Sequence, residues 1–279
     1  MKQVLIAATE LAQALEKEGA PQVFDCRARL GDLEAGRRLW EAGHVPGSLH
    51  LDLDRDLAAE PGAGGRHPLP SADDFAATLR RLGVTPQRPI VVLDDMGGQL
   101  AAARAWWMLA IWAGHPDVRV LDGGLKAWQE AGGELVLRQE PLPEPSLWQP
   151  TFNDGARIAA DEVFSGRELK VDARSEERYR GEAEPIDPVA GHIPGAVCRP
   201  SAANLADTGR FKAPEALEAE LPRAEAAIVA YCGSGVTACH NILAYAVAGR
   251  ALPRLYAGSW SEWVRDPSRP VARSGRGNA

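Results

Sequence analysis

One cysteine in this chain has the surroundings of a nucleophile. The apolar run 228–231 ends at Cys232, and the loop Gly233-Ser234-Gly235-Val236-Thr237 follows it. Glycines at alternate positions let the backbone curl, so that successive N–H groups turn toward one point. A helix that begins just after the loop adds unpaired N–H donors and partial positive charge. Such a cradle stabilises a thiolate over a thiol, and a thiolate is a nucleophile.

The elements that must position Cys232 alternate between strand and helix. Apolar runs that end at an Asp or Gly turn predict buried strands at 23–25, 90–93, 119–121 and 228–231. Ser71 precedes two acids and predicts a capped helix start. An apolar face at helical spacing predicts a helix over 237–248, which Gly249 ends. This alternation predicts α/β units with parallel sheets, and ligands of such sheets bind beyond the carboxyl ends of the strands.

The chain contains an internal repeat. Residues 23–27 correspond to 170–174, the Gly-His-Val-Pro-Gly box at 43–47 corresponds to the Gly-His-Ile-Pro-Gly box at 191–195, and the run 90–94 corresponds to 228–232. The prolines between 138 and 150 favour an extended linker. We therefore predict an N-terminal domain at 1–137, a Pro-rich linker at 138–150 and a C-terminal domain at 151–279. Asp94 stands where the second half has Cys232, so the first domain is predicted to be catalytically inactive.

Composition excludes several classes of protein. With 279 residues, 45% hydrophobic and 25% charged, the chain can bury a core, and its formal charge of −7 provides no general attraction for nucleic acid or anionic lipid. Four cysteines without a Cys-x-x-Cys pair favour reduced thiols over a structural zinc site or a disulfide scaffold. We expect a cytoplasmic protein with no metal, no nucleic-acid partner and no membrane partner.

These motifs together resemble the two-domain rhodanese-type sulfurtransferases over essentially the full length of the chain. The resemblance rests on the Gly-His-Ile-Pro-Gly box, the strand–Cys–loop segment, and Gly258-Ser259-Trp260 with Glu262-Trp263. The hexapeptide 232–237 is similar to the loop of 3-mercaptopyruvate sulfurtransferases. The resemblance implies two tandem rhodanese-like domains, each a small parallel sheet with helices on both faces.

The resemblance also implies a double displacement without any cofactor. A small anionic donor, 3-mercaptopyruvate or thiosulfate, gives its outer sulfur to Cys232 as a persulfide. Cyanide, a small thiol or a thioredoxin-like acceptor then removes that sulfur. A thiosulfate-preferring rhodanese is the alternative within this class, and a non-catalytic persulfide carrier or thiol sensor is the alternative outside it.

Supporting residues follow from the same resemblance. Arg178 matches the arginine that holds the donor's anionic group, and Gly233, Gly235, Val236 and Thr237 form the loop around the donor. Ser234 is placed to pass a proton to the leaving enolate, with His44 and Asp32 as candidate helpers. His44 could equally anchor its own loop.

One position of the chain departs from the pattern of the family that it resembles. The place of a second donor-binding arginine, nine residues after Arg178, is occupied by Asp187. Arg66 and His67 are further candidates for lining the cleft. A cysteine phosphatase is disfavoured, because the position that would hold its phosphate-clamping arginine is Ala238.

Overall fold

The computed structural model describes residues 3–274, which fold into two compact units. The first unit consists of the chain up to Ala59, Leu69–Asp154 and Leu205–Phe211. The second consists of Glu60–Pro68, Gly155–Asn204 and the chain from Lys212 onward. Each unit thus contains one short segment from the other half of the sequence. The linker limits 138–150 remain a prediction.

The first unit is built on a five-stranded sheet in the order β1-β5-β4-β2-β3, with every pairing parallel. Its strands are β1 (Leu5–Ile6), β2 (Gln22–Asp25), β3 (Leu49–His50), β4 (Ile90–Leu93) and β5 (Val118–Leu121). Its helices are α1 (Ala8–Leu15), α2 (Ala35–Glu41), α3 (Ala72–Arg81), α4 (Ala102–Trp106), the π-helix η1 (Trp107–Trp112) and α5 (Gly124–Glu130), together with the short 3-10 turn η2 (Asp154–Ala156) at the boundary of the two units.

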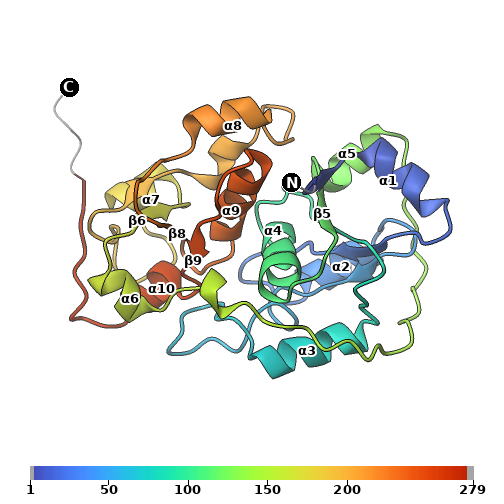
Figure 1. Ribbon diagram of the computed structural model, residues 1–279, viewed down its shortest axis with the longest axis horizontal. Helices are drawn as coiled ribbons and strands as arrows, with labels where there is room; N and C mark the ends of the chain where they lie inside the picture. The colour runs from blue at the N-terminus through green and yellow to red at the C-terminus, as the bar shows by residue number, and fades with distance from the viewer. Residues whose placement is uncertain (1–2, 275–279) are drawn as a thin grey trace. The chain divides into compact units, whose positions relative to one another are not determined.

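The second unit is built on a four-stranded parallel sheet in the order β7-β6-β8-β9. Its strands are β6 (Leu169–Asp172), β7 (Val197–Cys198), β8 (Ile228–Tyr231) and β9 (Arg254–Leu255). Its helices are α6 (Ala160–Ser165), α7 (Glu176–Arg180), the 3-10 turn η3 (Ser201–Asn204), α8 (Pro214–Glu220), α9 (Ala238–Val247) and α10 (Ser259–Trp263) (Figure 1). The predicted α/β class with a parallel sheet in each half is confirmed.

Burial explains why these short runs form strands. All four residues of β4 are buried, and three of the four residues of β8 are. A strand that is covered on both faces is apolar throughout and does not alternate between apolar and polar residues. β4 and β8 both have this continuous apolar pattern. β8 lies between β6 and β9 in the sheet, so its carboxyl end, where the Cys232 loop begins, lies at the centre of one sheet edge.

The helix boundaries follow local chemistry. Ser71 Oγ accepts the Asp74 N–H at 3.1 Å, which confirms the predicted cap of α3. α9 begins at Ala238 with Thr237 as its N-terminal flanking residue, and Gly249 follows with a φ of +71°. Within residues 3–274, no helix has the length and apolar character needed to cross a membrane.

Candidate active site

Cys232 lies between β8 and α9, and its side chain is almost fully buried. Its backbone is fixed from the α10 side. The Cys232 N–H donates to Ser259 Oγ at 3.1 Å, and the Cys232 carbonyl accepts the Trp260 N–H at 3.0 Å. The Gly233 carbonyl accepts the Ser261 N–H at 2.9 Å. The start of the loop is therefore anchored residue by residue to the N-terminal turn of α10.

The rest of the loop requires glycine at one point. Gly235 has a φ of +75°, and a Cβ at this position would collide with the carbonyl group of Ala257. Beyond it, Val236 is buried, and its carbonyl accepts the Cys239 N–H at 3.1 Å. Thr237 makes no side-chain cap bond, so the first N–H groups of α9 receive no partner from the Thr237 side chain. The loop thus leads directly from the thiol into a helix N-terminus.

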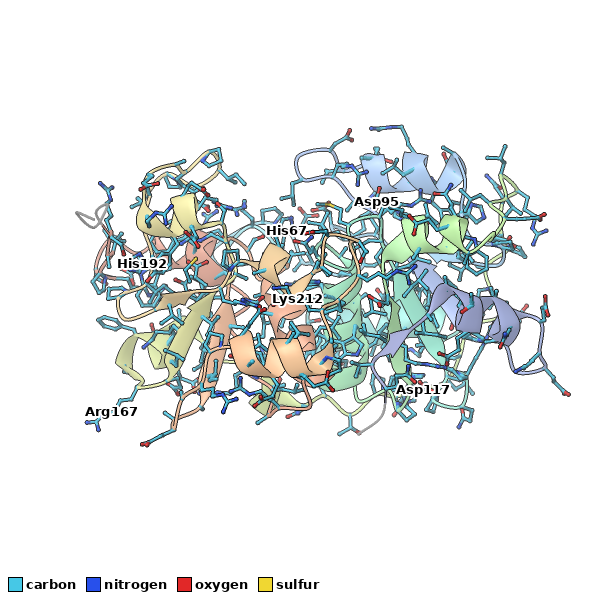
Figure 2. All side chains as sticks on the ribbon, turned by 90° about the horizontal axis from the view of Figure 1, so that it is seen from above. His67, Asp95, Asp117, Arg167, His192 and Lys212 are labelled. Carbon is cyan, nitrogen blue, oxygen red and sulfur yellow. The ribbon has the colours of Figure 1, made fainter. Side chains whose placement is uncertain are left out.

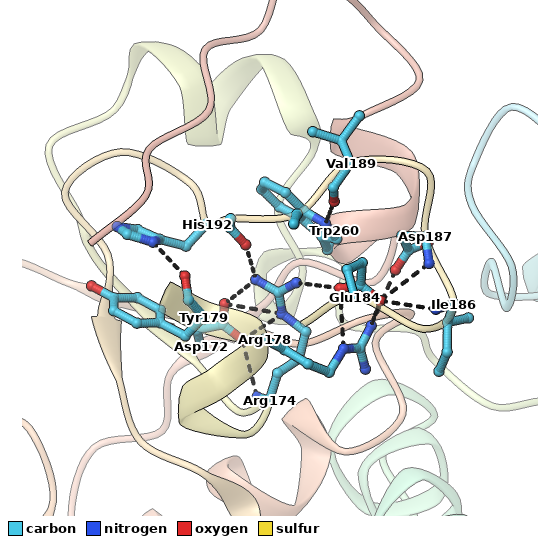
Figure 3. A network of polar contacts seen from close by, with 12 residues as sticks. Asp172, Arg174, Arg178, Tyr179, Glu184, Ile186, Asp187, Val189, His192 and Trp260 are labelled. Carbon is cyan, nitrogen blue, oxygen red and sulfur yellow. Dashed lines mark hydrogen bonds and ion pairs between the residues drawn. The ribbon is translucent and has the colours of Figure 1, made fainter. Parts of the chain in front are cut away.

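Arg178, on α7, lies in a network of acids and arginines (Figure 3). Its Nε and Nη2 donate to Glu184 at 3.1 and 2.7 Å, and Nη2 also donates to Asp187 Oδ2 at 3.3 Å. Burial by itself would raise the pKa of Glu184, but the hydrogen bonds from Arg178 and from backbone amides outweigh it, so that pKa is lowered. Arg174 continues the network to Asp172 and Glu184.

The segment Glu60–Pro68 brings two further side chains to this loop. Arg66 forms an ion pair through Nη1 with Asp187 Oδ1, and its backbone N–H donates to Ser261 Oγ at 3.1 Å. His67, labelled in Figure 2, has its Nδ1 2.7 Å from Ser234 Oγ. The second unit therefore contains a thiol, a hydroxyl–imidazole pair and two guanidinium groups on or beside one loop.

His44 has a different setting from the one its candidate role needs. It is fully buried in the first unit, with Nδ1 2.8 Å from the Trp40 carbonyl and its ring stacked on Trp40 at 4.1 Å between centroids. His192 makes the equivalent contacts in the second unit, with Nδ1 2.7 Å from the Tyr179 carbonyl and a ring stack at 3.8 Å. Both box histidines thus anchor a loop, and the imidazole hydrogen-bonded to Ser234 is that of His67. Asp32, the other candidate helper, forms an exposed ion pair with Arg38.

The sequence alone indicates Arg66 and His67 only as candidates for lining a cleft. The available signal is the glycine pair in Gly64-Gly65-Arg66-His67. In the structure Gly65 has a φ of +101°, and a Cβ there would lie 2.9 Å from the Gly258 carbonyl oxygen and 3.4 Å from the Glu262 backbone nitrogen. Such a glycine marks a close approach of two backbones. The sequence does not reveal that the approached backbone belongs to α10.

The first unit has a carboxyl group at the position that corresponds to the thiol. Asp94 follows β4 and is buried. Its Oδ1 accepts the N–H groups of Met96 and Gly98 at 2.9 and 2.8 Å, and its Oδ2 accepts those of Leu100 and Ala102 at 3.3 Å. The carboxyl group thus occupies the amide cradle of its own loop. Among the described residues, no group of three or more His, Cys, Asp or Glu side chains could hold a metal ion.

Comparison with known proteins agrees with this geometry. The rhodanese-like domain family matches residues 7–131 and 157–266. A Pseudomonas aeruginosa chain, named a probable 3-mercaptopyruvate sulfurtransferase, is 46% identical over 280 residues that cover 96% of this chain and 97% of that one. The thiosulfate sulfurtransferase of Bos taurus is 34% identical over 262 residues, which cover 88% of this chain and 86% of the bovine chain.

A solved structure gives the same result at the level of the fold. The 3-mercaptopyruvate sulfurtransferase from Leishmania major superimposes with a TM-score of 0.82 at 30% identity, covering 95% of this chain and 76% of that one. The chain belongs to the rhodanese family, as a two-domain member with one rhodanese-like domain in each half. It is a sulfurtransferase.

Proposed function

We propose that this sulfurtransferase uses Cys232 as its nucleophile and prefers 3-mercaptopyruvate to thiosulfate as donor. The observation that carries the proposal is the position of the Arg178 guanidinium, whose terminal nitrogens lie 3.4 and 3.5 Å from the point where a Cβ of Gly233 would be. A guanidinium presents parallel N–H donors that match a planar carboxylate. A donor held there by its carboxylate would lie beside the residue that directly follows Cys232.

The first half-reaction follows from these groups. The Cys232 thiolate attacks the donor sulfur, an S–S bond forms, and the C–S bond of mercaptopyruvate breaks. The electron pair of that bond goes to carbon as the enolate of pyruvate, which takes up a proton. Ser234 Oγ, 2.7 Å from His67 Nδ1, provides a hydroxyl with an imidazole partner for this proton transfer. The persulfide remains on Cys232.

In the second half-reaction, an acceptor attacks the outer sulfur of the persulfide. The S–S bond then breaks and its electron pair returns to Cys232 as the thiolate. Cyanide, a small thiol and a thioredoxin-like protein all have the nucleophilic atom this step needs. The four cysteines are free thiols, which is consistent with a reducing compartment, and we infer a cytoplasmic enzyme that requires no added cofactor.

The first domain is proposed to take no part in the covalent chemistry. A carboxyl group in the amide cradle of its loop cannot carry a sulfane sulfur, and Asp94 occupies that cradle. A thiosulfate preference is the second candidate, since the bovine relative that covers most of this chain is a thiosulfate sulfurtransferase.

Initial rates of thiocyanate formation from cyanide, measured side by side with both donors, test the proposal. We expect a higher kcat/KM with mercaptopyruvate, and in Cys232→Ser a loss of activity with both donors to below about a tenth. Cys198→Ser, which also lies at a strand end of the second unit, is the matched control and should keep its activity. A faster reaction with thiosulfate would reverse the donor preference, and retained activity in Cys232→Ser would disprove the nucleophile.

A different outcome is that a persulfide forms rapidly on Cys232 but cyanide and thiols do not remove its outer sulfur. That outcome would indicate a sulfur carrier rather than an enzyme. Intact-mass measurement before and after addition of the acceptor distinguishes this outcome from catalysis.

A further inference from the structure

We propose that Arg66 is the second arginine of the donor site and that Asp187 is the positioning residue that aims it. The inference rests on the proposed donor site at Gly233. In this chain the expected place of the second arginine, position 187, carries an acid. The proposal assigns the anion-binding role to Arg66 instead, which lies 121 positions before Asp187 in the sequence.

The first observation is the convergence of two guanidinium groups on Gly233. The point where a Cβ of Gly233 would be lies 2.9 Å from Arg66 Nη2 and 3.4 Å from Arg178 Nη2. Gly233 directly follows Cys232, so both groups lie beside the residue that begins the loop. Their side chains are 26% and 18% exposed, so both groups are only partly accessible to solvent.

The second observation is how Asp187 divides its two oxygens. Its side chain is 4% exposed, Oδ1 pairs with Arg66 Nη1, and Oδ2 accepts from Arg178 Nη2 at 3.3 Å. One carboxylate thus bridges two guanidinium groups, using one terminal nitrogen of each. A bridging carboxylate offsets the repulsion that would otherwise separate two cations held this close.

The third observation concerns the guanidinium nitrogens of Arg66 and Arg178 that do not bind Asp187 or Glu184. The hydrogen bonds of Arg66 and Arg178 within the described part of the chain give no partner to Arg66 Nη2 or to Arg178 Nη1. Both nitrogens lie near the Gly233 position, at 2.9 and 3.5 Å. Together they form a two-armed fork, one arm from each arginine, that suits a single carboxylate or another small oxyanion.

Asp187 is itself held in place by its own loop. The N–H groups of Ile186 and Asp187 donate to Glu184 Oε1 at 3.2 and 3.1 Å (Figure 3). Glu184 in turn binds Arg178 and Arg174. The carboxylate that orients Arg66 is therefore fixed to the same network that fixes Arg178.

An arginine at position 187 would break both bridging bonds and add a third cation to the cluster, so Asp187→Arg alone should weaken donor binding.

The test is a set of variants assayed for kcat and KM with mercaptopyruvate. We expect Arg66→Ala to raise KM by about tenfold with kcat changed by less than about threefold, because a charge-assisted contact to the bound donor is lost. Arg66→Gln retains an amide that can donate to Asp187 but lacks the free guanidinium arm, and it should show the same rise. The matched control is Arg254→Ala, since Arg254 is 30% exposed and is also held by acids, Glu162 and Glu168.

The double-mutant cycle separates positioning from general stability. If Asp187 acts through Arg66, Asp187→Ala should raise KM severalfold in the wild type and by less than about twofold in the Arg66→Ala background. The double variant Arg66→Ala with Asp187→Arg returns a second arginine to the cluster and should recover part of the affinity. Melting temperatures are measured for every variant, because a structural role would lower them in parallel with activity.

A KM within about twofold of the wild type in both Arg66→Ala and Arg66→Gln would overturn the inference. So would a double-mutant cycle in which Asp187→Ala raises KM by the same factor with and without Arg66→Ala. Failure of the proposed function gives a different result, namely a wild type that does not turn over mercaptopyruvate. In that case the same cycle is measured with thiosulfate, whose sulfonate end is also an oxyanion, and an unchanged KM would again overturn the inference.

Discussion

Ser259 Oγ accepts the Cys232 N–H at 3.1 Å and donates to the Tyr256 carbonyl at 2.9 Å. Ser259 has a φ of +53°, and no other non-glycine residue among 3–274 has a positive φ. The left-handed region costs a residue with a Cβ roughly 1–2 kcal/mol. A strained serine thus connects the backbone of Cys232, the proposed nucleophile, to the segment after β9. Strain of this kind is retained where it positions a functional residue.

Substitutions at Ser259 should separate strain from positioning. Ser259→Ala keeps the strain and loses both hydrogen bonds, so we expect a loss of about 1–2 kcal/mol of stability and a severalfold lower kcat. Ser259→Gly relieves the strain and should recover about 1 kcal/mol, yet kcat should stay low. Urea unfolding and steady-state kinetics measure the two effects. Ser165→Ala, on the exposed face of α6, is the control, and a wild-type kcat in Ser259→Ala would argue against a positioning role.

The Ser234–His67 pair should matter for one donor more than for the other. Pyruvate leaves mercaptopyruvate as an enolate that needs a proton, whereas sulfite leaves thiosulfate with the S–S electron pair and needs none. Loss of a positioned proton donor costs about a hundredfold or more. We therefore expect Ser234→Ala and His67→Asn to lower kcat for mercaptopyruvate by about that factor and for thiosulfate by less than about threefold. Equal losses with both donors, measured as pyruvate and sulfite release, would show that the pair only supports the loop.

Much of the fold could be predicted because its signals are local. Apolar runs ended by turns predict β2, β4, β5 and β8, and the cap at Ser71 and the stop at Gly249 predict helix limits that the structure confirms. The two-residue strands β1, β3, β7 and β9 are too short to leave such a run, and they are not predicted. The π-helix at Trp107–Trp112 was not predicted, since a change from i+4 to i+5 hydrogen bonding leaves little trace in an apolar sequence.

Local pattern predicts the candidate site only where its residues are neighbours in sequence, and Arg178 is added by the family resemblance rather than by spacing. Cys232, Ser234 and Gly235 share one loop, and its glycine spacing predicts a tight turn, which agrees with the φ of +75° at Gly235. The partners of that loop come from far away: His67 lies 167 residues before Ser234, and Arg66 lies 121 residues before Asp187. Nothing local distinguishes His67 from His44, and only tertiary packing shows that His44 stacks on Trp40 while His67 contacts Ser234.

The cysteines should differ in their reactivity toward iodoacetamide. Burial, with a smaller contribution from the Asp172 charge, raises the pKa of Cys198 to about 12, and burial also raises the pKa of Cys26. A raised pKa keeps a thiol protonated, and therefore unreactive, until the pH approaches that value. At pH 8 we expect one label per chain, on the Cys232 peptide, and Cys198 labelling that grows about tenfold per pH unit above it.

Peptide mapping by mass spectrometry measures this labelling. Cys232→Ser should take up almost none at pH 8. Rapid labelling of Cys198 at pH 8 would contradict the effect of burial on its pKa.

Asp94 should stabilise the first unit without serving the reaction. Its carboxyl group accepts the N–H groups of Met96, Gly98, Leu100 and Ala102. Asp94→Ala would leave these donors without that acceptor, and an unsatisfied buried donor costs about 1–3 kcal/mol. We expect the variant to lose about 2 kcal/mol or more in urea unfolding, with kcat for sulfur transfer within about twofold of the wild type. Intact mass after donor exposure should show one added sulfur, on Cys232, in both proteins. A large drop in kcat for a variant that remains folded would mean that the first domain contributes to catalysis.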